Sequence, residues 1–500
     1  MIKMNKNKNM NMKGGDMLAS GGYGCVFKPA LKCKGSYQNE RKTGYISKLM
    51  TEKHAKSEYG EIETFKKVLE KIPNYNDYFL VSGFSLCEQP ILEEEDLSNF
   101  KKCKALTKKD FTAENIDSRL NELMSLNMPD GGIDVKTFFS QPFSPERMVN
   151  MNNTLIDLLI NGIKPMNDLD LYHCDIKSGN VLVSFKNSFK MEDEERNQEK
   201  EKEVFGEKGS EIYCKLIDWG LSIHHENKKG IPKRLYRRPF QYNVPFSNVL
   251  FNKVFTERYS IFLSLLEEKN HKLDKITIRE FVLQYIFEWN KIRGDGHFKI
   301  INSIIKSLDN NDLDNIKERI AEMNMSDRIV ECEFAYYYII EYISDILLKF
   351  TINGEFDVLN YFNNIFLKVI DIWGFVMIYT MLIKQLTDNF TEFEKLTESQ
   401  IRLIMEIKNI IFDFLFKNPT KVIDINDLAS ELQSLNGIIL EIEPYESKSK
   451  SKSKSKSKSE TSSSSLKGGS NNKKKTRKQS RKQSRKQSRK KKTASKKKKR

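Results

Sequence analysis

The chain has 500 residues, of which 39% are hydrophobic and 30% are charged. This composition supplies apolar side chains for more than one sizeable core and excludes a wholly disordered chain. The formal net charge of +16 is concentrated at one end, because residues 446–500 carry 25 Lys and Arg against 2 Asp and Glu, a net of +23. The remaining residues have a net charge of −7, so the folded part is mildly acidic.

The N-terminal part reads as a small sheet with one helix. Residues 1–15 are rich in Lys, Asn and Met, and we expect a disordered leader there. Over residues 16–128, short apolar runs with Gly and Pro punctuation surround one helical pattern at residues 57–72. The apolar face of that helix consists of Ile62, Phe65, Val68, Leu69 and Ile72.

Helical periodicity dominates from Phe138 onward, interrupted by two short strand-like runs near residues 173–183 and 213–220. Two segments look like insertions: residues 187–211, which are almost all charged or polar, and a long helical stretch at about 250–367. In the second insert, apolar residues recur at helical spacing, and we interpret them as packing residues, with a dedicated docking surface as the alternative. They are Ile278, Phe281, Val282, Tyr285, Ile286 and Trp289. Residues 446–500 have almost nothing to bury, which predicts a disordered Lys/Arg/Ser-rich tail.

Seven cysteines are scattered along the chain without CxxC or Cys/His spacing. This pattern predicts reduced, unpaired thiols and favours a cytoplasmic location. The longest apolar stretch, residues 372–383, is too short to cross a bilayer, and the N-terminus lacks the apolar segment of a signal peptide. The sequence therefore indicates neither membrane insertion nor secretion.

Two motifs carry the strongest chemical signal: HCDIKSGN at residues 173–180 and DWG at residues 218–220. This set of side chains suits phosphoryl transfer, in which one carboxylate orients a hydroxyl group and a lysine neutralises the migrating phosphate. Asp175 and Lys177 would fill these two roles, while Asn180 and Asp218 would hold magnesium. Either motif alone is weak, but the two in this order are specific.

These motifs resemble the catalytic loop and the metal-binding motif of protein kinases. The resemblance implies an α+β, bilobal protein kinase-like fold. Its N-lobe, a small β-sheet with one helix, would cover residues 16–128, and a larger, mainly α-helical C-lobe would cover residues 129–440. The cofactors implied are ATP and Mg2+, or Mn2+ in its place. Lys177 is typical of serine/threonine kinases, so the implied acceptors are Ser and Thr hydroxyls of proteins.

Residues 18–27 (LASGGYGCVF) resemble the glycine-rich loop of kinases. The resemblance assigns nucleotide binding to Gly21, Gly22, Gly24 and Val26, because glycine allows the backbone to approach phosphates closely. Ala19 stands where the first glycine usually lies, so the match is partial. Taken alone, the segment is more typical of an ordinary hairpin turn.

Lys48 fits the strand lysine of kinases that contacts the α- and β-phosphates. A helix glutamate must orient this lysine, and Glu58, Glu61 and Glu63 are the candidates. We choose Glu61 because apolar residues follow it at four and seven positions, as in kinase helices, while Glu58 stays the alternative. Without Lys48 nearby, any of the three would be read as part of a solvated helix face.

Two further positions follow from the resemblance. Residues 123–134 look like the last small-lobe strand and the hinge, where backbone groups around Met128 would bond adenine and Asp134 would accept from the ribose. Asp371 resembles the aspartate that braces the catalytic loop from a buried helix. An N-cap at the start of that apolar helix is an equally good interpretation of Asp371.

The substrate-facing segment departs from the kinase pattern. Cys174 stands where kinases commonly have an Arg that pairs with a phosphate on this segment, and residues 219–244 contain Ser222 and two tyrosines but no Thr. The Ala-Pro-Glu end of the segment is missing, and the Thr that usually steadies the catalytic Asp has no clear counterpart. This indicates an enzyme that is not switched on by phosphorylation of this segment.

The segment PFQYN at residues 239–243, the Ile/Asn/Lys-rich composition and the large helical insert resemble serine/threonine protein kinases of giant (nucleocytoplasmic large) DNA viruses. This resemblance spans about residues 16–437. It implies a location in the host cell cytoplasm or in the virion, and the basic tail adds a nuclear location as an alternative.

The basic tail should bind polyanions such as nucleic acid nonspecifically, since it releases counterions but has no aromatic residues to stack on bases. A merely solubilising or nuclear-targeting role is the alternative. Ser480, Ser484 and Ser488 each have an Arg three residues before them and a Lys two residues before them, which is the pattern that basophilic kinases accept. We therefore expect the tail to be a target of phosphorylation.

These observations predict an ATP-dependent protein kinase that transfers the γ-phosphate to Ser/Thr hydroxyls of a protein substrate, with no membrane span. The alternative is a catalytically weak pseudokinase scaffold that binds partners or nucleic acid through its insert and basic tail. A kinase-like enzyme acting on a small molecule is a third interpretation. The intact Lys48, Asp175, Asn180 and Asp218 argue against the scaffold, while Ala19 argues for it.

Overall fold

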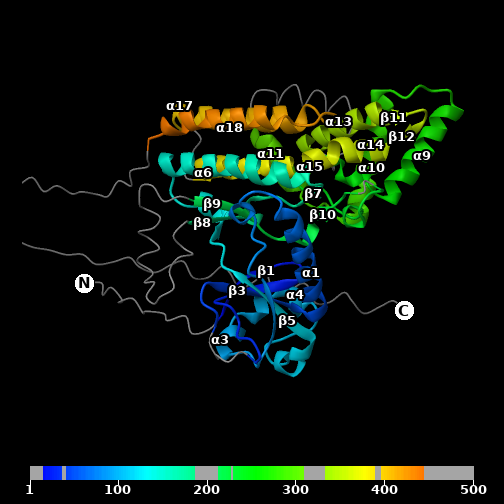
Figure 1. Ribbon diagram of the computed structural model, residues 1–500. Helices are drawn as coiled ribbons and strands as arrows, with labels where there is room; N and C mark the ends of the chain where they lie inside the picture. Colours follow the sequence, from blue (N-terminus) through cyan, green and yellow to red (C-terminus); the bar gives the residue numbers. More distant parts are fainter. Residues whose placement is uncertain are drawn as a thin grey trace, which may run out of the picture. The chain divides into compact units, whose positions relative to one another are not determined.

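A computed structural model describes residues 15–35, 41–185, 212–226, 229–308, 333–388 and 396–443 (Figure 1). Residues 1–445 form one compact unit, and residues 446–500 are a second unit. The expected leader, the 187–211 insert and the basic tail lie outside the described residues. Within the described residues the protein is mixed α/β, with a small sheet near the N-terminus and a mostly helical remainder.

A five-stranded antiparallel sheet forms the N-terminal region, with the strand order β1-β2-β3-β5-β4. Its strands are β1 (Asp16–Ser20), β2 (Gly24–Lys28), β3 (Tyr45–Thr51), β4 (Ser85–Glu88) and β5 (Leu123–Pro129). Helix α1 (Glu52–Leu69) follows β3 with no intervening residue. It buries Ile62, Phe65, Val68 and Leu69 of the predicted apolar face, but it covers 52–69 rather than 57–72. Ile72 is buried just after the helix ends.

Short helical turns connect the strands of this region. They are α2 (Tyr75–Tyr78), α3 (Glu94–Leu97), η1 (Phe100–Lys102), α4 (Lys104–Thr107) and η2 (Ile116–Glu122). Phe100, Leu106 and Phe111 from this part of the chain pack with Cys25 and Phe27 of β2 in a small second core. The strand that follows the glycine-rich turn is therefore covered by residues far along the sequence.

Two disulfides tie the sheet region together, so the expectation of unpaired thiols is wrong for four cysteines. Cys25 pairs with Cys103 and Cys33 pairs with Cys87, with Cα–Cα distances of 5.7 and 5.4 Å. Their sequence separations of 78 and 54 residues carry no pairing signal, because only the folded sheet brings the partners within bonding reach. Two other described cysteines, one of them Cys174, are free and buried.

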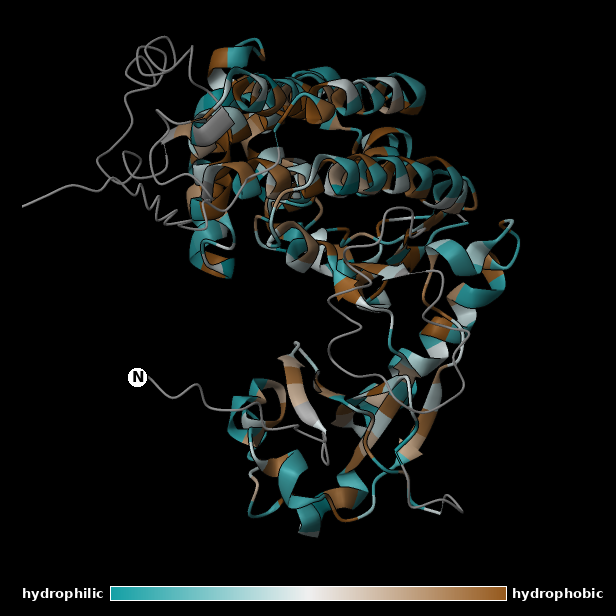
Figure 2. Ribbon diagram, turned by 90° about the vertical axis from the view of Figure 1, so that its left-hand side faces the viewer, coloured by the Kyte–Doolittle hydropathy of each residue, from teal (hydrophilic) through white to brown (hydrophobic). Residues whose placement is uncertain are grey.

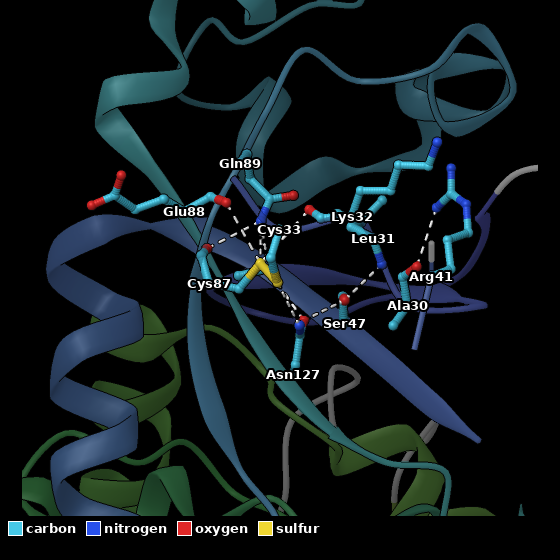
Figure 3. Close-up of a disulfide and its surroundings, with 11 residues drawn as sticks. Ala30, Leu31, Lys32, Cys33, Arg41, Ser47, Cys87, Glu88, Gln89 and Asn127 are labelled. Atoms are coloured by element: carbon cyan, nitrogen blue, oxygen red, sulfur yellow. Dashed lines mark hydrogen bonds between the residues drawn. A yellow bond between two sulfur atoms is a disulfide. The ribbon is translucent and has the colours of Figure 1, made fainter. Parts of the chain in front are cut away.

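A buried polar chain lies beside the Cys33–Cys87 disulfide (Figure 3). Asn127 Nδ2 donates to Cys33 Sγ at 3.2 Å, and Ser47 Oγ donates to Asn127 Oδ1 at 2.5 Å. The backbone N–H of Leu31 donates to Ser47 Oγ at 2.8 Å. These bonds join the loop after β2 to β3, the strand that carries Lys48, and to its neighbour β5. A satisfied buried network of this kind makes the region rigid.

The remainder of the described chain is mostly helical. Its longer helices are α6 (Pro145–Asp157), α9 (Lys253–Glu268), α10 (Lys275–Arg293), α11 (Phe298–Leu308), α13 (Glu333–Phe350), α15 (Leu367–Val376), α16 (Thr380–Asp388), α17 (Glu398–Ile411) and α18 (Ile425–Leu440). Figure 2 shows hydrophilic and hydrophobic stretches alternating along the helices, the pattern of helices that bury one face.

Shorter elements link these helices. The helical ones are α5 (Val135–Phe139), η3 (Leu158–Ile163), α7 (Lys164–Asp168), η4 (Ser178–Asn180), η6 (Trp219–Leu221), η7 (Lys233–Leu235), η8 (Phe246–Leu250), α14 (Val358–Tyr361), η10 (Phe362–Phe366), η11 (Met377–Tyr379) and η13 (Phe412–Phe416). The strands are β6 (Ile133–Asp134), β7 (Leu171–Tyr172), β8 (Val181–Phe185), β9 (Ile212–Leu216), β10 (Ile223–His224), β11 (Thr351–Ile352) and β12 (Glu355–Phe356). They form a sheet of order β6-β8-β9 and two pairs, β7 with β10 and β11 with β12.

Helix α10 belongs to the second expected insert, and its periodic apolar residues are all buried. Between 0 and 9% of each residue's surface is exposed, from Ile278 at one end to Trp289 at the other. The helix packs against α13 of the same insert. This confirms the interpretation of these residues as packing residues.

A helical run at Val358–Thr387 is long and apolar enough to cross a membrane, by length and composition alone, and is longer than the stretch considered in the sequence. Within its most apolar window, however, 78% of the residues are buried inside the protein. Both Asp371 and Trp373 in this run are fully buried against other parts of the chain. The run therefore has the surroundings of a core helix, and the described residues contain no clear membrane span.

Candidate active site

Residues 173–180 form a loop between β7 and β8 that gathers three of the expected side chains. Asp175 lies at its centre and is only 5% exposed. Lys177 Nζ donates to Asp175 Oδ2 at 2.6 Å, and Asn180 Nδ2 donates to the same oxygen at 3.1 Å and to the Asp175 carbonyl at 2.9 Å. The single turn η4 brings Asn180 back over Asp175, so the loop closes on its own carboxylate.

The surroundings of Asp175 keep its carboxylate ionised. Burial alone would raise its pKa, but the positive charge and hydrogen bond of Lys177 lower it. The charge of Arg238 and a hydrogen bond from Asn243 act in the same direction, and the net result is a pKa below the ordinary value. An ionised carboxylate at this position can accept a hydrogen bond, and then a proton, from a hydroxyl group.

Asn243 and Arg238 come from the segment after DWG, and sequence analysis missed both. Asn243 Nδ2 donates to Asp175 Oδ1 at 2.9 Å and to the Ile176 carbonyl at 3.2 Å. Asn243 therefore steadies the carboxylate, a role for which the sequence offered no Thr. Arg238 Nη1 donates to the Cys174 carbonyl at 2.6 Å, and its Nη2 lies 3.6 Å from Asp175 Oδ1. The one available signal was that both residues lie in the RRPFQYN segment, which stands where kinases have their Ala-Pro-Glu motif.

Asp371 braces the candidate catalytic loop, residues 173–180, from α15. Its Oδ2 accepts a hydrogen bond from the His173 backbone N–H and its Oδ1 accepts one from the Cys174 backbone N–H, both at 2.8 Å. Asn167 Nδ2 also donates to Oδ2, at 2.8 Å. Asp371 lies inside α15, so the N-cap alternative is wrong. Burial raises the pKa of Asp371, while the charge of His173 and the three donated hydrogen bonds oppose that rise.

Asn180 and Asp218 lie at the same end of one β-hairpin. Asn180 immediately precedes β8 and Asp218 follows β9 by one residue, and the register pairs Val181 with Leu216. The Ile217 N–H donates to the Asn180 carbonyl at 3.0 Å, which holds the two segments together. Asp218 is exposed and has a left-handed backbone with φ of 66°.

These two residues fit a magnesium ion. Asn180 uses its Nδ2 to donate to Asp175, so its amide oxygen is not engaged by that carboxylate and would bind a metal ion together with Asp218 at this end of the β8–β9 pair. Within the described ranges no group of three His, Cys, Asp or Glu could hold a metal. Mg2+ binds few protein ligands and keeps phosphate oxygens and waters in its shell, so one amide and one carboxylate are a suitable pair.

Lys48 pairs with Glu58 and not with Glu61, which corrects our choice between the candidates. Lys48 Nζ lies 2.6 and 2.9 Å from the two Glu58 carboxylate oxygens. Glu61 instead forms an ion pair with Arg234, which also donates to the Gly220 carbonyl at 3.1 Å. Because α1 begins directly after β3, the first turns of the helix carry Glu58, rather than Glu61, to the lysine.

The DWG tryptophan, Trp219, connects α1 to the candidate catalytic loop. The Trp219 ring lies 5.9 Å from Phe65 of α1, 5.8 Å from Phe79 and 5.0 Å from the His173 ring. His173 Nε2 is 2.9 Å from the Ile217 carbonyl. A continuous aromatic contact therefore runs from α1 to the loop that holds Asp175, and spacing along the sequence did not reveal it.

The glycine-rich residues form the turn between β1 and β2. The Gly21 N–H donates to the Gly24 carbonyl at 2.9 Å, while a side chain at Gly22 would meet nothing within 4 Å. At Gly24 a Cβ would overlap Met50 Cγ and approach the Leu49 carbonyl to 2.6 Å, so packing against β3 requires this glycine. Val26 pairs with Lys48 across the two strands.

The two expected hinge residues lie on separate short elements. Met128 is in β5, paired with Ile46 of β3, and is partly exposed. Asp134 is the N-cap of α5, where its Oδ1 accepts from the Thr137 N–H at 2.6 Å. The structure therefore gives Asp134 a local capping role, and its expected contact with a ribose stays a prediction.

No known family model matches this chain, and no curated protein matches it. Among solved structures, it is similar to the crystal structure of a kinase domain from Plasmodium, with 14% sequence identity and a TM-score of 0.29. That match covers 86% of this chain and 97% of the other. A likeness of this size decides nothing about function, and the candidate site rests on the geometry of its own residues.

Proposed function

We propose that this protein is an ATP-dependent serine/threonine kinase of the protein kinase superfamily, with a two-lobed fold. The observation that carries the proposal is the set of contacts around Asp175. A buried, ionised carboxylate is bonded to Lys177 and Asn180, and its loop is braced by Asp371. Positioning and charge stabilisation of this kind are what phosphoryl transfer requires of a protein.

The side chains divide the work between the acceptor and the nucleotide. Asp175 accepts the hydrogen of the acceptor hydroxyl, and Lys177, 2.6 Å away, offsets the negative charge that develops on the transferred phosphate. Lys48, oriented by Glu58, neutralises phosphate oxygens of ATP. Asn180 and Asp218 would hold Mg2+, or Mn2+ in its place, and the ion would supply positive charge to offset that of the phosphates.

The first test is transfer of radiolabelled γ-phosphate from Mg-ATP to a basic Ser/Thr test protein and to the enzyme itself. We expect incorporation by the wild-type chain and none by Asp218→Asn, because Asp218 is the only carboxylate assigned to the metal. Acid hydrolysis of the product should yield phosphoserine or phosphothreonine. Absence of both transfer and nucleotide binding would favour the pseudokinase scaffold instead.

The cellular setting is also a proposal: the cytoplasm of a host cell or the virion of a giant DNA virus, with the nucleus as the alternative. The disulfides remove one argument for the cytoplasm, since that expectation relied partly on reduced thiols. Imaging of the full chain in host cells, with and without residues 446–500, tests the location. Nuclear accumulation that depends on the tail would support the nuclear alternative.

A further inference from the structure

Residues 237–243 form the segment that holds Arg238 and Asn243. Four of its backbone carbonyls accept hydrogen bonds from residues outside it. Without these donors the four carbonyls would bond to water instead, and nothing would hold the segment in one conformation. The donors are Trp289 Nε1 to Arg238 O at 3.2 Å, Asn248 Nδ2 to Pro239 O at 3.2 Å, the His297 N–H to Phe240 O at 2.8 Å, and Trp373 Nε1 to Tyr242 O at 2.9 Å.

Two of these donors belong to the helical insert. Trp289 is near the end of α10 and is 2% exposed, and His297 ends the short loop that joins α10 to α11. The insert also supplies ring contacts, because Phe298 lies 5.4 Å from Phe240, edge to face, and His297 lies 5.4 Å from Tyr242. The insert is therefore packed on the segment over several consecutive residues.

The loop can approach so closely because of Gly296. Its φ is +52°, and a Cβ at this position would overlap the Phe240 carbonyl oxygen and lie 2.9 Å from Pro239 Cβ. Gly294, two residues earlier, also has a positive φ of 77°, but a Cβ there would meet nothing within 4 Å. Of the two glycines, only Gly296 is required by contact with the segment.

The opposite side of the segment touches the candidate catalytic loop. Asn243, 1% exposed, donates to Asp175 Oδ1, and Arg238, 5% exposed, donates to the Cys174 carbonyl. A shift of the segment would therefore move an amide and a guanidinium away from Asp175. The segment thus contacts both the insert and the loop that holds Asp175.

We infer that Trp289 and the Gly294–His297 loop of the insert act as a brace that positions Arg238 and Asn243 against Asp175. The brace residues are positioning residues, and this role rests on the proposed kinase function. The segment is held by the protein's own helices, so the acceptor side of the site is ordered without a phosphate on the segment. The insert would thus affect catalysis by positioning Arg238 and Asn243, and its brace residues would not contact the nucleotide.

The test compares Gly296→Ala with Gly294→Ala in the full chain, and adds Trp289→Phe, which removes the indole N–H but keeps an aromatic ring. Both glycine variants carry the strain of a positive φ, so their difference isolates the contact with Phe240. For Gly296→Ala we expect kcat/KM for the protein acceptor to fall by about 100-fold, the effect of a displacement of roughly 1 Å at a catalytic group. The affinity for nucleotide should be unchanged, and Trp289→Phe should show a smaller loss of the same kind.

A second measurement does not depend on activity. Hydrogen exchange of the His297 amide and of the amides in residues 237–243 should be faster in Gly296→Ala and Trp289→Phe than in the wild type and in Gly294→Ala. Equal exchange and equal kinetics in the two glycine variants would overturn the brace. If the wild-type protein transfers no phosphate, the kinase proposal fails, while the exchange rates still decide whether the insert holds the segment.

Discussion

At the scale of single residues, Asp175 depends on partners from three separate parts of the chain. Lys177 and Asn180 come from its own loop, Asn243 from the substrate-facing segment, and Asp371 reaches the loop backbone from a core helix. The carboxylate is held from both of its oxygens, since Oδ1 and Oδ2 have different donors. Lys177 and Asn243 each lower the pKa of Asp175 against the effect of burial, and all the donors help to orient the group.

Replacement of Asn243 by Asp should change the pH dependence of the reaction. In the wild type the pKa of Asp175 is below its ordinary value, so the base is ionised at neutral and mildly acidic pH, and activity is lost only as pH falls through that low pKa. A second carboxylate beside Oδ1 raises the pKa of Asp175, so the acidic limb of kcat/KM moves to higher pH. Asn243→Ala, which only removes a donor, should move it less. Identical acidic limbs in the three proteins would contradict this role of Asn243.

The partner of Lys48 can be identified with two matched variants. The Lys48–Glu58 side chains are 15 and 16% exposed, whereas those of Arg234 and Glu61 are 36 and 30% exposed. We expect Glu58→Gln to lower kcat/KM for ATP by about 10- to 100-fold, the range for loss of a hydrogen bond between charged groups. Glu61→Gln should cost about threefold or less, as for a partly exposed ion pair. The reverse order would restore Glu61 as the partner.

At the scale of elements, the sheet region depends on its disulfides. The Cys25–Cys103 disulfide joins β2 to the turns that cover it, so replacement of both cysteines by Ser should lower the free energy of unfolding by about 2–4 kcal/mol in urea denaturation. Reductant should destabilise the wild type more than this variant, which retains only Cys33–Cys87. Peptide mapping without reductant should recover both linked pairs, and their absence would contradict the pairing.

Contacts between residues close together in the sequence were predictable, whereas contacts between distant residues were not. Asp175, Lys177 and Asn180 lie within one short loop, so their spacing predicted that they meet. Asn243 contacts Asp175 across 68 residues, and no periodicity connects them. The apolar face of α1 was predictable from a 3.6-residue repeat, but the choice between Glu58 and Glu61 depended on the start of the helix, which a repeat does not fix.

Cysteine pairing shows the same limit at a longer range. The pairs are 78 and 54 residues apart, and seven scattered cysteines without a metal-type spacing look unpaired until the sheet is folded. By contrast, the insert's aromatic residues were correctly interpreted as packing, because burial of an amphipathic face is a property of one helix. Their contact with the substrate-facing segment was not predictable, since it joins two helices to a loop of irregular backbone.

At the scale of the whole molecule, charge is separated between the folded unit and the tail. Residues 446–500 have a net charge of +23, and the remaining residues have a net of −7. We expect the full chain to bind duplex DNA without sequence preference, and a chain ending at residue 445 to lose this binding. If six to ten phosphates are contacted, affinity should fall by roughly 10³- to 10⁵-fold between about 50 and 200 mM salt. Binding retained by the shorter chain would assign it to the folded unit.

The junction between β3 and α1 has a mechanical consequence. Strand β3 ends at Thr51 and α1 begins at Glu52, so no loop residue separates them. Hinges are a few loop or element-terminal residues that absorb a rotation, and here Thr51 and Glu52 are the residues at the junction. Lys48 on β3 and Glu58 on α1 are therefore joined by a continuous stretch of regular structure, and we expect a movement of the helix to move the lysine as well. Any turn of α1 away from β3 would therefore have to be absorbed at the Thr51–Glu52 junction itself.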